Sequence, residues 1–232
     1  MSAFMNKSNI EDETWVSVSD MMAGLMMVFL FIAVLYMLQM KKEKDSAVDI
    51  AKDFQAKKED IYKDLLAEFG KDLPRWRASI NQETLSIKFS EPTIYFDQNS
   101  SNLAESFRNI IADFFPRYSK LLFSKYKDDI EEVRIEGHTS SEWNQEIDPD
   151  TAYIENMRLS QDRARNVLQY ALQLVNGDEK AWLVQNLTAN GLSSSKLEKD
   201  KNTNTEIKEA SRRVEFRVRS KTEGKLKDIS EK

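Results

Sequence analysis

The sequence has no cysteine, one histidine, six glycines and four prolines among its 232 residues. Without cysteine there is no disulfide framework, no thiolate metal site and no cysteine nucleophile. The low glycine and proline content excludes collagen-like chains and proline-rich disordered chains. The sequence also lacks a phosphate-binding loop, a dinucleotide fingerprint and a catalytic-triad motif. We therefore do not expect an enzyme.

The charges and the apolar residues are unevenly distributed. The formal net charge is −5, which disfavours nucleic acid as a partner for the chain as a whole. Although 41% of the residues are hydrophobic and 31% are charged, the apolar ones are concentrated in one N-terminal run. The length allows one or two domains of ordinary size. The composition therefore predicts a membrane segment joined to a water-soluble part.

The N-terminal run, residues 21–38, has no charge over 18 positions. At about 1.5 Å per residue it spans about 27 Å, close to the hydrocarbon core of a bilayer. Trp15 and Tyr36 lie near its two ends, where amphipathic rings favour the membrane interface. A cleaved signal peptide is the alternative, but the preceding segment is acidic and no small-residue cleavage site follows. We predict a retained transmembrane helix at 15–39 after a short cytoplasmic segment, 1–14.

Asp20 is the notable residue of this helix, because it lies about one turn inside the Trp15 end. A charge within a membrane helix costs about 2.5–3.5 kcal/mol at mid-depth and less near an end. Asp20 could simply mark the boundary and reach the lipid headgroups. However, Ser17, Ser19 and Gly24 are small and permit close contact with another helix. A carboxylate that is partly desolvated there is suited to reversible protonation or ion binding.

A helical stalk or linker is predicted at 40–76. Residues 41–69 contain no glycine or proline and are rich in lysine, glutamate, aspartate and alanine. Apolar residues recur at helical spacing, at Ala47, Ile50, Ala51, Phe54, Ile61, Leu65 and Phe69. This stripe could pack on the C-terminal domain of the same chain or form a short coiled coil with a second copy, and we favour the coiled coil. Gly70 and Pro74 end the helix.

From Thr84 onward the pattern changes to that of an α/β domain. Alternating apolar and polar residues predict strands at 84–89, 132–137, 187–192 and 212–219. Helical spacing predicts helices at 103–123, with a kink or break at Pro116, and at 156–175. The order β-α-β-α-β-β predicts an α/β sandwich with helices on one face of a mixed sheet. We place this domain at 77–221 and a flexible tail at 222–232.

Five short segments in this domain carry a resemblance. They are TIYF at 93–96, IEGHT at 135–139, NMRLSQDRA at 156–164, ANG at 189–191 and ASRRVE at 210–215. In this order they resemble the consecutive motifs of OmpA-like and MotB-like peptidoglycan-binding domains. The N-terminal WVSVSDMMAGLMMVFL at 15–30 resembles the membrane anchor of MotB-type stators. It is most similar to the ZorB family of Zorya anti-phage defence systems, because the basic tail of flagellar MotB is missing and the stalk is short.

The resemblance implies a role in an ion-driven motor. Asp20 would carry the translocated proton or sodium ion, with no other cofactor. Two copies of the chain would sit inside a ring of five MotA-like (ZorA-like) subunits in the bacterial inner membrane. A flagellar-type MotB stator and a passive OmpA-like cell-wall tether without ion conduction are the alternatives.

The resemblance also implies that the C-terminal domain binds peptidoglycan. Arg163 would pair with a carboxylate of diaminopimelate in the stem peptide, for which the guanidinium fork is suited. Asn156 and Leu159 would lie on the same face of the helix. Thr139, Ser140 and Arg213 complete the candidate set, although Arg213 is equally suited to a structural role.

One position departs from the family pattern. The family usually has aspartate directly after Gly-His-Thr, whereas this chain has Ser140. An acidic partner for the ammonium group of the ligand is therefore missing there. The acidic residues that could replace it are Glu142, Glu146, Asp148 and Asp150.

Two further expectations follow. Lys41, Lys42 and Lys44 after the apolar run would place the C-terminal part in the cytoplasm, but wall binding requires it in the periplasm, so we expect a cytoplasmic N-terminus. His138 is the only histidine, and no other ligands are spaced around it for a metal site. We interpret His138 as a residue that orders its loop and expect no metal.

Overall fold

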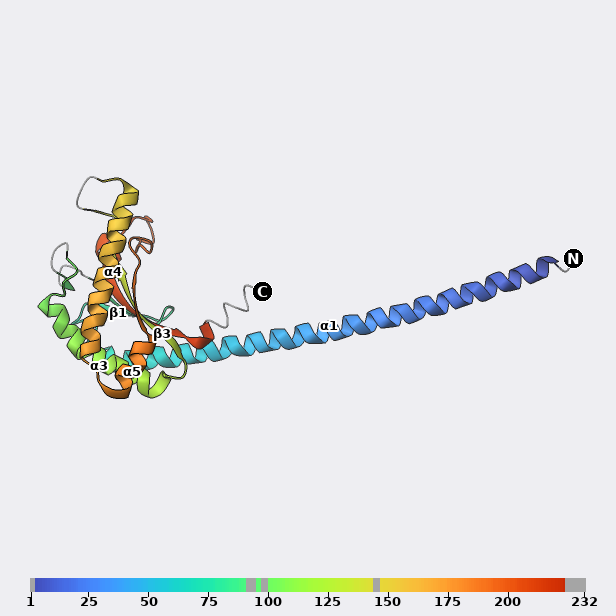
Figure 1. The fold of residues 1–232 in the computed structure, drawn as a ribbon, viewed down its shortest axis with the longest axis horizontal. Helices are drawn as coiled ribbons and strands as arrows, with labels where there is room; N and C mark the ends of the chain where they lie inside the picture. Colours follow the sequence, from blue (N-terminus) through green and yellow to red (C-terminus); the bar gives the residue numbers. More distant parts are fainter. Residues whose placement is uncertain (1–2, 91–94, 97–99, 144–146, 224–232) are drawn as a thin grey trace. The chain divides into compact units, whose positions relative to one another are not determined.

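The computed structural model describes residues 3–90, 95–96, 100–143 and 147–223, with side chains described from residue 18 onward. The chain divides into two compact units, Met1–Ala51 and Lys52–Lys232. Helix α1 (Ala3–Phe69) begins in the first unit and ends in the second (Figure 1).

The first unit consists of the N-terminal part of α1. Its large apolar side chains between Met21 and Leu38 are 44–75% exposed. A window of 18 residues in this helix has a mean hydropathy of 2.5, and none of it is buried. A helix that is apolar on all sides is stable only when lipid or other helices surround it. Its length and composition suit a membrane span.

In the second unit, the end of α1 belongs to the hydrophobic core. Ile61, Leu65 and Phe69 are completely buried there. Arg117, from the helix at 105–126, stabilises the end of α1. Its Nε donates to Glu68 Oε1 at 2.7 Å, and its guanidinium lies 5.0 Å from the centre of the Phe69 ring. For these three apolar positions the coiled-coil prediction was wrong. Because the chain turns back into the sheet after Phe69, the last turns of the helix pack on their own domain.

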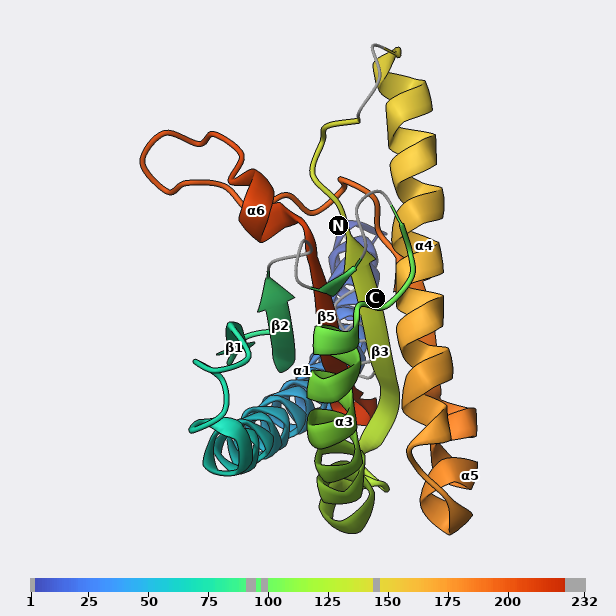
Figure 2. The same ribbon diagram turned by 90° about the vertical axis from the view of Figure 1, so that its left-hand side faces the viewer.

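The second unit is an α/β domain with one five-stranded sheet in the order β1-β2-β5-β3-β4. The strands are β1 (Ala78–Asn81), β2 (Ser86–Ser90), β3 (Ile130–His138), β4 (Leu187–Gly191) and β5 (Arg213–Ser220). The helices are α3 (Glu105–Tyr126), α4 (Pro149–Gln173), α5 (Gly177–Asn186) and α6 (Lys208–Ser211). Strands β3 and β4 are parallel, whereas the other pairs are antiparallel. The predicted α/β class with a mixed sheet is confirmed, and Figure 2 shows α3 and α4 alongside the sheet.

The core lies between the sheet and α3 and is strongly aromatic. Alternate residues of β5, Val214 and Phe216 among them, are buried toward it. The ring of Phe114 lies 5.3 Å from that of Phe89 and 5.0 Å from that of Phe216, measured between centroids. Edge-to-face contacts of this kind add about 0.5–1.5 kcal/mol per pair to the burial of the rings.

Some elements differ from the sequence-based predictions. Of the kink or break expected at Pro116, the break was wrong, because helix α3 continues through this residue. Proline costs the helix one hydrogen bond, but Phe114, Phe115 and Tyr118 around it are fully buried and hold the helix against the sheet. Helix α4 begins at Pro149 rather than at 156, because Asp148 accepts hydrogen bonds from two backbone N–H groups of its first turn. Strand β1 and helices α5 and α6 were not predicted.

Two glycines let α4 cross the sheet at backbone contact. Gly137 and Gly191 are paired residues of β3 and β4. A Cβ at Gly137 would overlap the carbonyl oxygen of Ser160 in α4, and a Cβ at Gly191 would lie 2.5 Å from the backbone nitrogen of Gln161. Both glycines are therefore needed for close approach.

We expect Gly137→Ala to lower the free energy of unfolding by about 3 kcal/mol or more, because the overlapping atom is backbone and cannot move aside. Gly24→Ala is the control, since nothing lies within 4 Å of that position. Urea denaturation of the detergent-solubilised chain, followed by tryptophan fluorescence, measures the difference. Equal unfolding midpoints for Gly137→Ala and the natural chain would contradict this packing.

Candidate functional site

Helix α4 carries three of the predicted ligand-binding residues. Asn156 and Arg163 are buried, with 3% and 8% of their surface exposed, whereas Leu159 is half-buried. Asn156 Nδ2 donates to the backbone oxygen of Glu142 at 3.2 Å, so it holds the segment that precedes α4. Asn156 and Arg163 thus lie on the inner side of the helix, whereas Leu159 is partly exposed.

The guanidinium of Arg163 lies between a backbone carbonyl and an aromatic ring. Its Nε donates to the oxygen of Ser100 at 3.1 Å, and its central carbon lies 4.8 Å from the centre of the Phe96 ring. Asn166, one turn along the helix, donates to the oxygen of Ser101 at 2.8 Å. The segment before α3 and helix α4 together therefore build the surroundings of Arg163.

Arg163 has no counterion among the described residues. Burial lowers the pKa of Arg163 to about 10, and the charge of Arg212 acts in the same direction. The guanidinium still carries its charge at neutral pH. No acidic side chain in the described part of the chain lies within ion-pair distance of it. A buried, unpaired guanidinium is a suitable group to bind a carboxylate through two parallel hydrogen bonds.

The segment after β3 is held against α4 through Ser193. The backbone nitrogen of Thr139 donates to Ser193 O at 3.0 Å, and the backbone nitrogen of Ser193 donates to Ser160 Oγ at 3.0 Å. Thr139 and Ser140 are both 3% exposed. The Thr139 Oγ1 atom is buried and has no hydrogen-bond partner within the described ranges. This hydroxyl is thus left without a hydrogen bond at a place that solvent does not reach in the structure.

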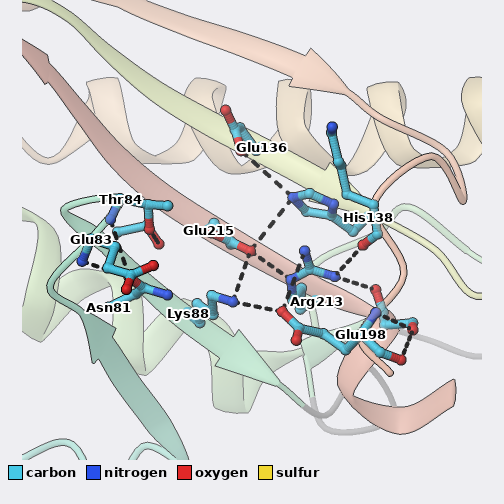
Figure 3. A network of polar contacts seen from close by, with 12 residues as sticks. Asn81, Glu83, Thr84, Lys88, Glu136, His138, Glu198, Arg213 and Glu215 are labelled. Atoms are coloured by element: carbon cyan, nitrogen blue, oxygen red, sulfur yellow. Dashed lines mark hydrogen bonds and ion pairs between the residues drawn. The ribbon is translucent and has the colours of Figure 1, made fainter. Parts of the chain in front are cut away.

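Arg213 lies in a different environment. Its Nε donates to Glu215 Oε1 at 2.6 Å, and its Nη1 donates to the backbone oxygens of Lys196 and Ser211, each at 3.1 Å. Since Val214 faces the core, Arg213 projects from the opposite face of the sheet. Figure 3 shows it within a network of charged side chains there. The structure therefore does not bring Arg213 together with Arg163.

Arg212 is a residue of this region that sequence reasoning did not select. Its charge acts on Arg163, and its Nε atom is buried without a hydrogen-bond partner in the described structure. Its described ion-pair partner is Glu209, at 3.5 Å. The sequence did contain a signal for Arg212, namely two adjacent arginines at the start of a strand. Because successive side chains of a strand point to opposite faces, Arg212 and Arg213 could not both lie at the same site.

The four acidic residues considered as substitutes at Ser140 differ in position. Glu142 accepts a hydrogen bond from Lys208 Nζ, and this bond holds the pKa of Glu142 below its usual value. Asp148 caps α4, while Asp150 is exposed in the first turn of that helix. Glu146 lies outside the described residues. Glu142 and Asp148 therefore both already have hydrogen-bond partners within the chain.

Asp20 lies on the exposed surface of α1, next to Met21, which is 71% exposed. It is the only charged residue between positions 18 and 40. The side chains of Trp15 and Ser17 lie outside the described residues. The role of Asp20 stays a prediction.

Comparison with known proteins identifies the family. Residues 95–212 match the OmpA family. Over 224 residues, the chain is 42% identical to the Zorya protein ZorB from Escherichia coli, covering 96% of this chain and 94% of that protein. The chain belongs to the ZorB family. The membership predicted from the five motifs and the N-terminal run is thereby confirmed.

The fold has a counterpart among solved structures. A MotB-like protein from Desulfovibrio vulgaris has 19% sequence identity to this chain and a TM-score of 0.51, covering 72% of this chain and 93% of that one. This likeness shows that the sheet and helices of this ZorB-family member follow a known MotB-like fold.

Proposed function

We propose that this chain is a MotB-like stator subunit of an ion-driven complex in anti-phage defence, with a structural and ion-carrying role and no enzymatic one. It would cross the bacterial inner membrane once and hold the complex to peptidoglycan through its OmpA-family domain. Membership of the ZorB family over almost the whole chain supports this proposal.

The position of Asp20 carries the proposal. It is the one charge within an apolar helix segment whose side chains have no cover in the described chain. Within the hydrocarbon region of a membrane, a carboxylate is stable only beside other helices or water. A ring of five MotA-like subunits around two copies of this helix would provide those neighbours. Binding and release of H⁺ or Na⁺ would then switch the charge of Asp20 and change its contacts with the ring.

Peptidoglycan binding is proposed at Arg163. Its guanidinium has a single described hydrogen bond and no carboxylate partner, so a diaminopimelate carboxylate of a stem peptide would supply the missing charge. With Ser140 in place of an aspartate, recognition would rest mainly on the carboxylate of the ligand and less on its ammonium group.

The proposed orientation places the N-terminus in the cytoplasm and the OmpA-family domain in the periplasm. Alkaline phosphatase folds only in the periplasm, so we expect a fusion to the C-terminus of the full chain to be active. The three lysines at 41, 42 and 44 predict the reverse by the positive-inside rule. An inactive phosphatase fusion, together with an active cytoplasmic reporter at the same position, would overturn peptidoglycan binding as the function.

A further inference from the structure

Three buried side chains on the face of the sheet away from α4 converge on one point. Glu136 and His138 belong to β3, and Glu215 belongs to β5. Glu136 and Glu215 are directly opposite each other in the antiparallel register, and His138 lies two residues further along the same face. Their donor atoms all lie within 4.8 Å of one another. The expectation that no ligands are spaced around His138 was therefore wrong, because pairing of distant strands brings them together.

The polar atoms of this cluster are incompletely satisfied. His138 is 3% exposed, and both its ring nitrogens are buried without a hydrogen-bond partner in the described structure. Its Nε2 points between the two carboxylates and lies 3.7 Å from an oxygen of each, too far for a hydrogen bond (Figure 3). Two like charges directly opposite on neighbouring strands destabilise a sheet unless a cation lies between them.

The neighbouring cations do not neutralise Glu136. Arg213 Nε is bonded to Glu215 Oε1 at 2.6 Å. Lys88 Nζ is bonded to Glu198 at 2.6 Å and lies 3.7 Å from Glu215 Oε1, so both cations act on Glu215. Among the described residues, the one charged partner within 4 Å of Glu136 is His138. The Glu136 carboxylate therefore faces the Glu215 carboxylate without a hydrogen bond in the described structure, and the histidine between them makes no hydrogen bond either.

We propose that this cluster binds a divalent transition-metal ion of the zinc type through His138 Nε2 and one oxygen each of Glu136 and Glu215. Imidazole and carboxylate are ligands that Zn²⁺ accepts, with a fourth position left for water. Zinc–ligand distances of about 2.1 Å place neighbouring donors about 3.4 Å apart in a tetrahedron. The two 3.7 Å separations from His138 need to close by a few tenths of an ångström, and the three donors, which lie within 4.8 Å of one another, need to draw together around the ion.

The ion would fasten the end of β3 to β5. His138 is the last residue of β3, and Thr139 and Ser140 follow it directly. The metal would therefore stabilise the base of the segment that carries two of the candidate peptidoglycan-binding residues. Its role would be structural, independent of whether Arg163 binds peptidoglycan.

The test uses the full chain in detergent, purified without a histidine tag and stripped of metal with a chelator. Titration calorimetry with Zn²⁺ and metal analysis after gel filtration are expected to give one ion per chain. His138→Gln and Glu136→Gln should weaken Zn²⁺ binding at least about tenfold, since even substitutions outside the ligand shell cost that much. Glu132→Gln is the matched control on the same strand, because Glu132 is bonded to Arg134 and Arg219. It should bind Zn²⁺ like the natural chain.

Thermal melting separates loss of the ligand from loss of the fold. Without metal, Glu136→Gln should melt at a higher temperature than the natural chain, because the substitution removes the repulsion between the two carboxylates. With excess Zn²⁺ the natural chain should gain stability and the variant should not. No stoichiometric Zn²⁺ in the natural chain, or equal binding by Glu136→Gln, would overturn the proposal.

Discussion

Replacement of Asp20 by asparagine is expected to abolish protection against phage while leaving the amount of the chain in the membrane unchanged. Asparagine keeps the size and the hydrogen-bonding capacity of the side chain but cannot bind and release a cation. If ion passage at this position drives the complex, the efficiency of phage plating on cells with the variant should equal that on cells without the system.

The matched control is Asp45→Asn. Asp45 is exposed on the same helix and lies beyond the apolar run, so its loss should leave protection intact. Asp20→Glu, which retains a carboxylate, should preserve more activity than Asp20→Asn. Full protection by Asp20→Asn would leave a passive cell-wall tether as the function, because a tether has no use for this charge.

The second large effect is expected at Arg163. Arg163→Gln should weaken sedimentation of the chain with purified peptidoglycan by about tenfold to a hundredfold, the range for hydrogen bonds to a charged group. Arg165→Gln is the control on the same helix. The Arg165 side chain is 65% exposed and pairs with Asp162, so its loss should not change binding.

Loss of the fold is not expected to explain the Arg163 result. Glutamine at this position loses the hydrogen bond to Ser100 O and the contact with Phe96, but it also removes the desolvation cost of a buried charge, so we expect little change in stability. Unchanged peptidoglycan binding by a folded Arg163→Gln variant would exclude this arginine as the ligand group.

Much of the domain fold followed from periodicity along the chain. Alternation predicted strands at 132–137, 187–192 and 212–219, and the structure has them at Ile130–His138, Leu187–Gly191 and Arg213–Ser220. Strand β1 has four residues and pairs only with β2, so it carries too few alternating positions to stand out. The continuous α3 reflects the burial of its aromatic residues, which outweighs the local effect of Pro116.

The surroundings of Arg163 and of His138 could be predicted only in part, because they depend on contacts between segments far apart in the sequence. The resemblance to OmpA-like domains selected Arg163 from a motif that is continuous in sequence, and its ligand-binding role stays a prediction. Arg212 acts on Arg163, and Glu215 approaches His138. Neither contact could be predicted, because each depends on the folding of segments that are far apart in the sequence. The apolar stripe at the end of α1 could equally pack on its own domain or on a second copy of the chain. Only the fold shows that Ile61, Leu65 and Phe69 pack on their own domain.

The most direct test of the ion-carrying role of Asp20 is cation uptake by membrane vesicles that contain this chain together with its MotA-like partner. The natural chain and Asp45→Asn should admit either H⁺ or Na⁺ down an imposed gradient, whereas Asp20→Asn should admit neither, at equal amounts of assembled complex. Equal cation uptake with Asp20→Asn and with the natural chain would contradict the account.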